Sequence, residues 1–160
     1  MKKGEIYEGI IEKVDFPNKG YVCIDDQKVL IKNGIPGQKV RFMIQKKRSG
    51  RAQGRILEVL EKSPFETRDA VCNNFPACGG CMYQTMSYEN QLVMKETQIR
   101  ELLEEALVRG GQVDKNGQAD FDWEGIHGSP IEFGYRNKME FSFGDEYKDG
   151  PLSLGLHKKG

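Results

Sequence analysis

Short runs of alternating apolar and polar residues fill the first sixty positions of the chain. The runs cover residues 5–16, 21–24, 28–32 and 40–44, and a last run, after a turn at Ser49 and Gly50, ends at Leu60. A period of two indicates strands that bury one face. Five short strands with tight turns and no helix predict an all-β small closed barrel of the OB or SH3-like kind, in which closure removes exposed sheet edges.

The pattern changes after Ser63-Pro64, which ends the last strand. Residues 73–76 (NNFP) and Gly79-Gly80 break regular structure, so this part is expected to be an irregular loop that needs a staple. A helix is predicted over residues 88–108, where apolar positions recur on one face, with Ser87 as its N-cap and Gly110-Gly111 at its end.

Two further strands are predicted near the end of the chain. Residues 138–143 and 152–156 alternate, and the residues between them predict a hairpin loop. One helix and one hairpin are too little for a complete domain. The sequence therefore predicts three parts, namely a barrel over 1–62, a cysteine loop over 63–84, and the start of a truncated α+β central domain over 85–160.

The charge is divided unevenly along the chain. Residues 1–60 carry 13 Lys and Arg against 7 Asp and Glu, whereas the remaining hundred carry 11 against 17. Seven cations with no acidic residue among them lie between positions 39 and 55: Lys39, Arg41, Lys46, Lys47, Arg48, Arg51 and Arg55. A solvated charged hairpin is one interpretation. A polyanion-binding edge is the other, with Lys46, Lys47, Arg48 and Arg51 as candidate phosphate contacts.

The chain contains neither a long apolar run that predicts a membrane span nor an apolar stretch near its start that is typical of a signal peptide. The cytoplasm is therefore the expected location. Thiols stay reduced there, so that clustered cysteines indicate metal or redox chemistry more often than disulfides.

Three of the four cysteines, Cys72, Cys78 and Cys81, form a C-x5-C-x2-C cluster. Thiolates two residues apart can bind one metal or one corner of a cluster, and Gly79-Gly80 lets backbone N–H groups point at the sulfurs. Three ligands are not a full set for zinc or for a four-iron cluster. Unmetallated thiols, zinc and iron–sulfur all remain open on spacing alone. The candidates for a fourth ligand inside the chain are Cys23, His127 and His157, although a buried strand residue and two surface histidines are the simpler interpretations.

Several segments resemble a known family. Residues 9–16 (GIIEKVDF), 19–22 (KGYV) and 35–40 (IPGQKV) are similar to a TRAM domain. Residues 72–84 (CNNFPACGGCMYQ) resemble the iron–sulfur segment of RNA uracil-5-methyltransferases, and residues 134–138 (GYRNK) resemble the first strand of that family's central domain. The resemblance runs through nearly the whole chain in order.

The resemblance implies a bacterial enzyme that methylates C5 of a uridine with S-adenosylmethionine, in ribosomal more than in transfer RNA. It implies a [4Fe–4S] cluster on Cys72, Cys78, Cys81 and a later cysteine beyond Gly160. The cofactor loop, the nucleophilic cysteine and the general base of that family have no match here. We therefore expect no catalytic residue in this chain, no activity from it alone, no membrane association, and a monomer.

Tyr135 and Arg136 are further candidates for contact with an unpaired RNA loop. The alternative is that Tyr135 is a core residue and that Arg136 pairs with Glu132 or Glu140. A competing hypothesis for the whole chain is a stand-alone RNA-binding module, stapled by zinc and without enzymatic activity.

Overall fold

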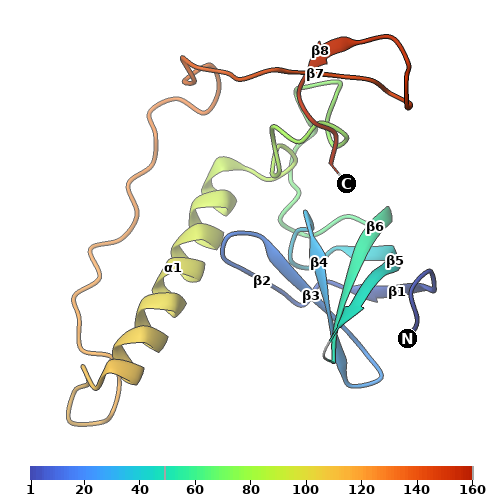
Figure 1. Cartoon of the computed structure of the whole chain (residues 1–160). Helices are drawn as coiled ribbons and strands as arrows, with labels where there is room; N and C mark the ends of the chain where they lie inside the picture. Colours follow the sequence, from blue (N-terminus) through green and yellow to red (C-terminus); the bar gives the residue numbers. More distant parts are fainter. Residues whose placement is uncertain (49, 160) are drawn as a thin grey trace.

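The computed structural model describes residues 1–48 and 50–159 (Figure 1). Ser49 of the predicted turn and Gly160, at the end of the predicted third part, lie outside the described residues. One sheet holds six strands: β1 (Ile6–Ile10), β2 (Lys13–Asp15), β3 (Lys19–Ile24), β4 (Gln27–Lys32), β5 (Lys39–Arg48) and β6 (Arg51–Glu61). Their order is β1-β5-β6-β4-β3-β2, and all neighbours are antiparallel except β4 and β6.

The N-terminal part is all-β, as predicted, but the closed barrel is wrong. The predicted strand over 5–16 is interrupted at Ile11 and Glu12. The Ile11 N–H donates to the Gln38 carbonyl (2.9 Å), whereas the Glu12 N–H donates to the Tyr21 carbonyl (3.0 Å), so the chain leaves the side of β5 and joins β3. Strands β1 and β2 become the two edges of the sheet, and no ladder joins them in the described part of the chain. The covalent chain, rather than hydrogen bonding, connects the edges.

The inner face of this sheet forms the hydrophobic core. Alternate residues point inward, and the buried cluster consists of Ile11, Val14, Val22, Val29, Ile31, Val40, Phe42, Ile44 and Ala52. Gly54 lies beneath this cluster, where an added Cβ would come within 2.7 Å of Phe42 Cδ2 and 2.8 Å of Ile31 Cδ1. Because Gly54 has no side chain, the side chains of Phe42 and Ile31 can pack directly against its backbone.

Helix α1 (Tyr88–Gly110) confirms the predicted helix and both of its ends. Ser87 Oγ accepts a hydrogen bond from the Asn90 N–H (3.2 Å), as expected of an N-cap. Gly111 adopts the left-handed conformation (φ 79°) that glycine takes at no steric cost, and its N–H returns to the carbonyls of the last turn.

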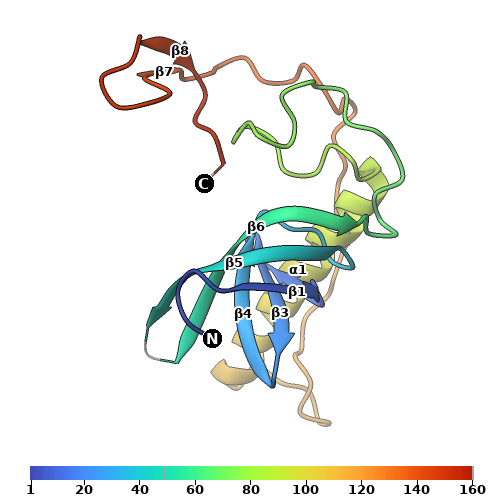
Figure 2. The ribbon, with the colours of Figure 1, turned by 90° about the vertical axis from the view of Figure 1, so that its right-hand side faces the viewer.

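The helix lies beside the sheet (Figures 1 and 2). The buried Gln98 side chain donates from Nε2 to the Val14 carbonyl of β2 over 2.7 Å. Lys13 Nζ lies 2.8 Å from Glu101 Oε2 on the same side, and this contact raises the pKa of Lys13. Helix α1 is thus fixed at the β2 edge.

The last part of the chain runs past the helix and ends in a small hairpin of β7 (Ser142–Gly144) and β8 (Ser153–Gly155). The predicted hairpin is confirmed, although its strands are shorter than 138–143 and 152–156. Phe143 on β7 and Leu152 just before β8 remain 74% and 73% exposed, because the two strands pair only with each other within the described residues. The described part of the chain contains no helix long and apolar enough to cross a bilayer.

Candidate nucleic-acid interface and cysteine loop

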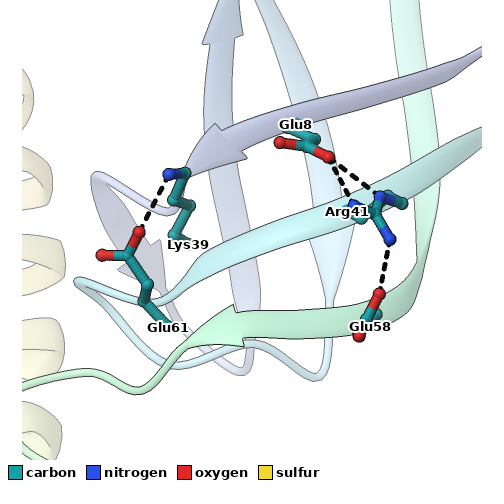
Figure 3. Close-up of polar contacts among 5 residues, drawn as sticks. All are labelled: Glu8, Lys39, Arg41, Glu58 and Glu61. Atoms are coloured by element: carbon teal, nitrogen blue, oxygen red, sulfur yellow. Dashed lines mark hydrogen bonds and ion pairs between the residues drawn. The ribbon is translucent and has the colours of Figure 1, made fainter.

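Two cations of the basic run are already paired within the sheet (Figure 3). Arg41 lies between Glu8 and Glu58 across three strands, with Nη2 2.8 Å from Glu8 Oε1 and Nη1 2.6 Å from Glu58 Oε2. Lys39 Nζ lies 2.9 Å from Glu61 Oε1. Hydrogen bonding to Glu8 raises the pKa of Arg41, and hydrogen bonding to Glu61 raises the pKa of Lys39. These two residues are therefore not free charges for a polyanion.

The other end of the β5–β6 hairpin has a different character. Lys46, Lys47, Arg48 and Arg51 are exposed, and none of them forms an ion pair with another described residue. Arg48 and Arg51 face each other in the strand register. Like charges opposite each other are unfavourable, so this tip, which we call the hairpin tip, is suited to an anion that relieves the repulsion.

The sheet also gathers cations that are scattered along the sequence. Lys19 on β3 and Lys28 and Lys32 on β4 share the outer face with Arg51 and Arg55 on β6. Sequence reasoning missed the three lysines because they lie outside the basic run. The signal that could have found them is their position out of phase with the buried residues Val22, Val29 and Ile31.

The predicted metal ligands lie on one loop. Cys72, Cys78 and Cys81 are free thiols, the first and last of them exposed, and the Gly80 N–H donates to Cys78 Sγ (3.3 Å). The structure does not gather the three into a ligand set, since no group of three or more metal-binding side chains occurs among residues 1–48 and 50–159. Free thiols with an N–H-to-sulfur contact nevertheless match the donor chemistry of zinc and iron–sulfur sites.

The C-terminal tail crosses this loop. The Gly79 N–H donates to the His157 carbonyl (2.8 Å), and the Lys159 N–H donates to the Ala77 carbonyl (2.9 Å). Burial lowers the pKa of Lys159, while the nearby Cys78 and Cys81 act in the opposite direction. Sequence reasoning missed Lys159, for which no local signal exists.

The three internal candidates for a fourth ligand are separated by the fold. Cys23 lies exposed on β3, and His127 lies exposed in the segment that follows α1. The His157 carbonyl accepts a hydrogen bond from the Gly79 N–H of the cysteine loop. None of them belongs to a ligand group in the described part of the chain.

A buried polar network joins the sheet to the cysteine loop. The Glu66 carboxylate accepts hydrogen bonds from Gln38 Nε2 (2.9 Å), the Ser63 N–H (2.8 Å) and Thr85 Oγ1 (2.8 Å). The three donor residues are each more than nine-tenths buried. Near Thr85, the Tyr83 hydroxyl is buried without a hydrogen-bond partner among the described residues, and burial raises the pKa of Tyr83 to about 12.

Tyr135 and Arg136 lie outside the core. Tyr135 is 63% exposed, so its interpretation as a core residue is wrong. Glu132 pairs with Arg68 (2.7 Å) and Glu140 pairs with Lys138 (2.7 Å), and in the described structure neither pairs with Arg136. Tyr135 and Arg136 thus remain accessible, although the structure does not bring them to the hairpin tip.

The site thus consists of a β-sheet whose basic hairpin tip has no acidic partners in the described structure, joined to a loop of three free thiols. No family model matches the chain. Its whole length is 45% identical to an uncharacterized RNA methyltransferase of Clostridium tetani and 44% identical to one of Caldanaerobacter subterraneus, each over 160 residues that make up 33% of the relative. A third, from Clostridium acetobutylicum, is 38% identical over 99% of this chain and 32% of the relative.

The chain belongs to the family of these RNA methyltransferases. It spans about a third of the length of the curated relatives that it matches.

Proposed function

We propose that this chain is the N-terminal RNA-binding and iron–sulfur portion of an S-adenosylmethionine-dependent RNA uridine C5-methyltransferase. The observation that carries the proposal is the hairpin tip, whose cations have no acidic partners in the described structure, in a chain that belongs to the RNA methyltransferases. The resemblance of residues 72–84 to the uracil-5 group supports the position of the methylated atom.

In this proposal the hairpin tip binds phosphates. Lys46, Lys47 and Arg48 supply charge, which gives affinity that falls with salt and depends little on base sequence. Tyr135 and Arg136 contact an unpaired loop, since exposed aromatic and guanidinium planes stack on splayed bases. Ribosomal RNA is the proposed substrate ahead of transfer RNA, and the protein acts as a monomer.

Cys72, Cys78 and Cys81 would hold a [4Fe–4S] cluster. The fourth ligand would come from a longer protein, in the region of the relatives that this chain does not cover. The cluster would supply a staple for an irregular loop and a one-electron redox centre. Cluster ligands require thiolates, so the proposal places the protein in a reducing compartment, the cytoplasm.

Methyl transfer itself belongs to the remaining two thirds of the relatives' length. Uracil C5 becomes nucleophilic when a thiolate adds at C6, and it then takes the methyl group from the sulfonium of S-adenosylmethionine. A base removes the C5 proton, and the thiolate leaves C6, which restores the double bond and the free thiolate. The target base must first leave its stack. None of the four cysteines of this chain is proposed as that thiolate, and the contribution of this chain is affinity and register.

The test is methyl transfer by a longer protein that joins this chain to the remaining two thirds present in its relatives. Ribosomal and transfer RNA are incubated with S-adenosylmethionine carrying a labelled methyl group, and nucleosides are identified by mass spectrometry. We expect 5-methyluridine in ribosomal RNA. A label on another base, or no transfer, would contradict the proposal.

A second candidate is a zinc-stapled RNA-binding module without enzymatic activity. It is favoured by one observation, the contact of the His157 backbone with the cysteine loop, because one histidine would complete a Cys3His site. Metal content separates the two candidates.

A further inference from the structure

The outer face of β3, β4 and the first half of β6 is a continuous surface. The ladder aligns Tyr21 with Leu30 and Leu30 with Gln53 across the three strands. Side chains in phase with these three point away from the buried core, as the burial pattern of each strand shows. The outward positions are Lys19, Tyr21, Cys23, Lys28, Leu30, Lys32, Arg51, Gln53 and Arg55.

This outer face is basic; Asp15 of β2 lies opposite Lys19 in the strand register but pairs with Lys13. Five of the nine side chains are cationic and none is acidic. No ion pair between described residues involves any of the five. The other half of the same sheet face holds the Glu8–Arg41–Glu58 row, in which the one cation lies between two carboxylates (Figure 3). The sheet thus separates a neutralised half from a positive half.

Tyr21 lies in the middle of the positive half. Its neighbours across the ladder are Lys13 on β2 and Leu30 on β4, and its side chain is partly exposed. Lys13 is itself held by Asp15 and Glu101. An aromatic ring beside an aliphatic side chain and flanked by cations offers a flat surface for one base and charge for the adjoining phosphates.

We propose that this outer face is a platform for single-stranded RNA, with one base stacked on Tyr21 and phosphates on Lys19, Lys28 and Lys32. The inference deepens the proposed function and rests on it. Neighbouring strands lie about 4.8 Å apart, so the cations of β3, β4 and β6 span about 10 Å across the sheet. A duplex keeps its base faces inside its own stack and offers Tyr21 none.

The experiment measures binding of the full 160-residue chain to a labelled oligouridine of about 12 nucleotides, a length within the range of sites on single-strand-binding domains, and to a duplex RNA of equal length. One variant carries Lys19→Gln, Lys28→Gln and Lys32→Gln. Its charge-matched control carries Lys95→Gln, Lys115→Gln and Lys148→Gln, three exposed lysines on α1, the following turn and the last hairpin loop. Tyr21→Leu is compared with Tyr21→Phe, and circular dichroism checks that each variant folds.

We expect the triple variant to lower the slope of log affinity against log salt by about 2, because each phosphate contact to a single strand contributes about 0.7. The control triple should keep the wild-type slope. Tyr21→Leu should weaken oligouridine binding about tenfold and leave duplex binding unchanged, while Tyr21→Phe stays within about twofold of wild type, since stacking needs the ring and not the hydroxyl.

A variant with Lys46→Gln, Lys47→Gln and Arg48→Gln distinguishes failure of the platform from failure of the proposed phosphate contact at the hairpin tip. If it loses affinity while the platform triple behaves as the control, the proposed hairpin contact stands and the platform is wrong. If the platform, hairpin-tip and control variants all bind RNA alike, both the platform and the hairpin contact are wrong. Equal losses for Tyr21→Leu and Tyr21→Phe, or equal losses on single strand and duplex, would also overturn the stacking role.

Discussion

Thr85 Oγ1 donates a hydrogen bond to Glu66 Oε1 over 2.8 Å and thereby joins the end of the cysteine loop to the segment that leaves the sheet. The second oxygen of the same carboxylate accepts from Gln38 Nε2 beside β5 and from the Ser63 N–H. One carboxylate thus connects the sheet to the cysteine loop, which the proposed function requires if both parts are to contact one RNA.

Replacing Glu66 with Ala should destabilise the chain by about 2–3 kcal/mol, because three buried donors lose a charged acceptor. Chemical denaturation measures the change. Glu12→Ala removes an exposed carboxylate between β1 and β2 and should change the stability far less. A Glu66→Ala chain as stable as wild type would show that the network does not hold the two parts together.

Gln98 anchors helix α1 to β2 through the Val14 carbonyl. We predict that Gln98→Ala lowers the free energy of unfolding by about 1–3 kcal/mol, since it leaves a buried carbonyl without a donor and creates a cavity. The control is Lys95→Ala, one turn away and exposed. Equal stability of the two variants would contradict the anchoring role.

Metal content distinguishes the cluster from zinc. Iron, sulfide and zinc are measured under anaerobic conditions on this chain and on the longer protein. The longer protein should contain about four iron and four sulfide, as a [4Fe–4S] cluster requires, whereas this chain with three of the ligands should hold little intact cluster.

Cys78→Ser should remove the iron of the longer protein, and Cys23→Ser should leave it unchanged, because Cys23 lies on β3 away from the loop. One zinc per chain, without iron in the longer protein, would favour the zinc-stapled module instead.

The pairing of Arg41 leads to a prediction about RNA affinity. Arg41→Gln removes a charge that is already paired with Glu8 and Glu58, so RNA affinity should remain within about twofold of wild type. Arg48→Gln removes a charge without an acidic partner in the described structure and should lower both affinity and salt slope. Binding titrations at several salt concentrations compare the two. A larger loss for Arg41→Gln would show that the whole basic run, and not its tip, contacts RNA.

Features set by neighbouring residues were predictable from the sequence. The two ends of helix α1, at Ser87 and Gly111, were predictable because an N-cap hydroxyl and a left-handed glycine act on backbone groups within one turn of the helix. The alternation of β5 likewise follows from its own side chains. The C-terminal hairpin was found for the same reason, although its strand lengths depend on partners that local pattern does not specify.

Features that depend on distant partners were not predictable. The interruption at Ile11 and Glu12 arises because their N–H groups bond to opposite sides of the sheet. Arg41 is neutralised by carboxylates 33 and 17 positions away in the chain, and only the strand register brings them together. Charge counted along the sequence therefore overstated the basic edge, and it missed the lysines of β3 and β4.

The central claim is that the hairpin tip binds RNA through phosphates, and the salt dependence of RNA binding tests it most directly. Affinity for a ribosomal RNA segment is measured over a salt series for the full chain, for the Lys46→Gln, Lys47→Gln, Arg48→Gln variant, and for the Lys95, Lys115, Lys148 control. The account predicts weaker binding and a shallower slope, by about 2–3, for the tip variant alone. Wild-type affinity and slope in the tip variant across the series would contradict it.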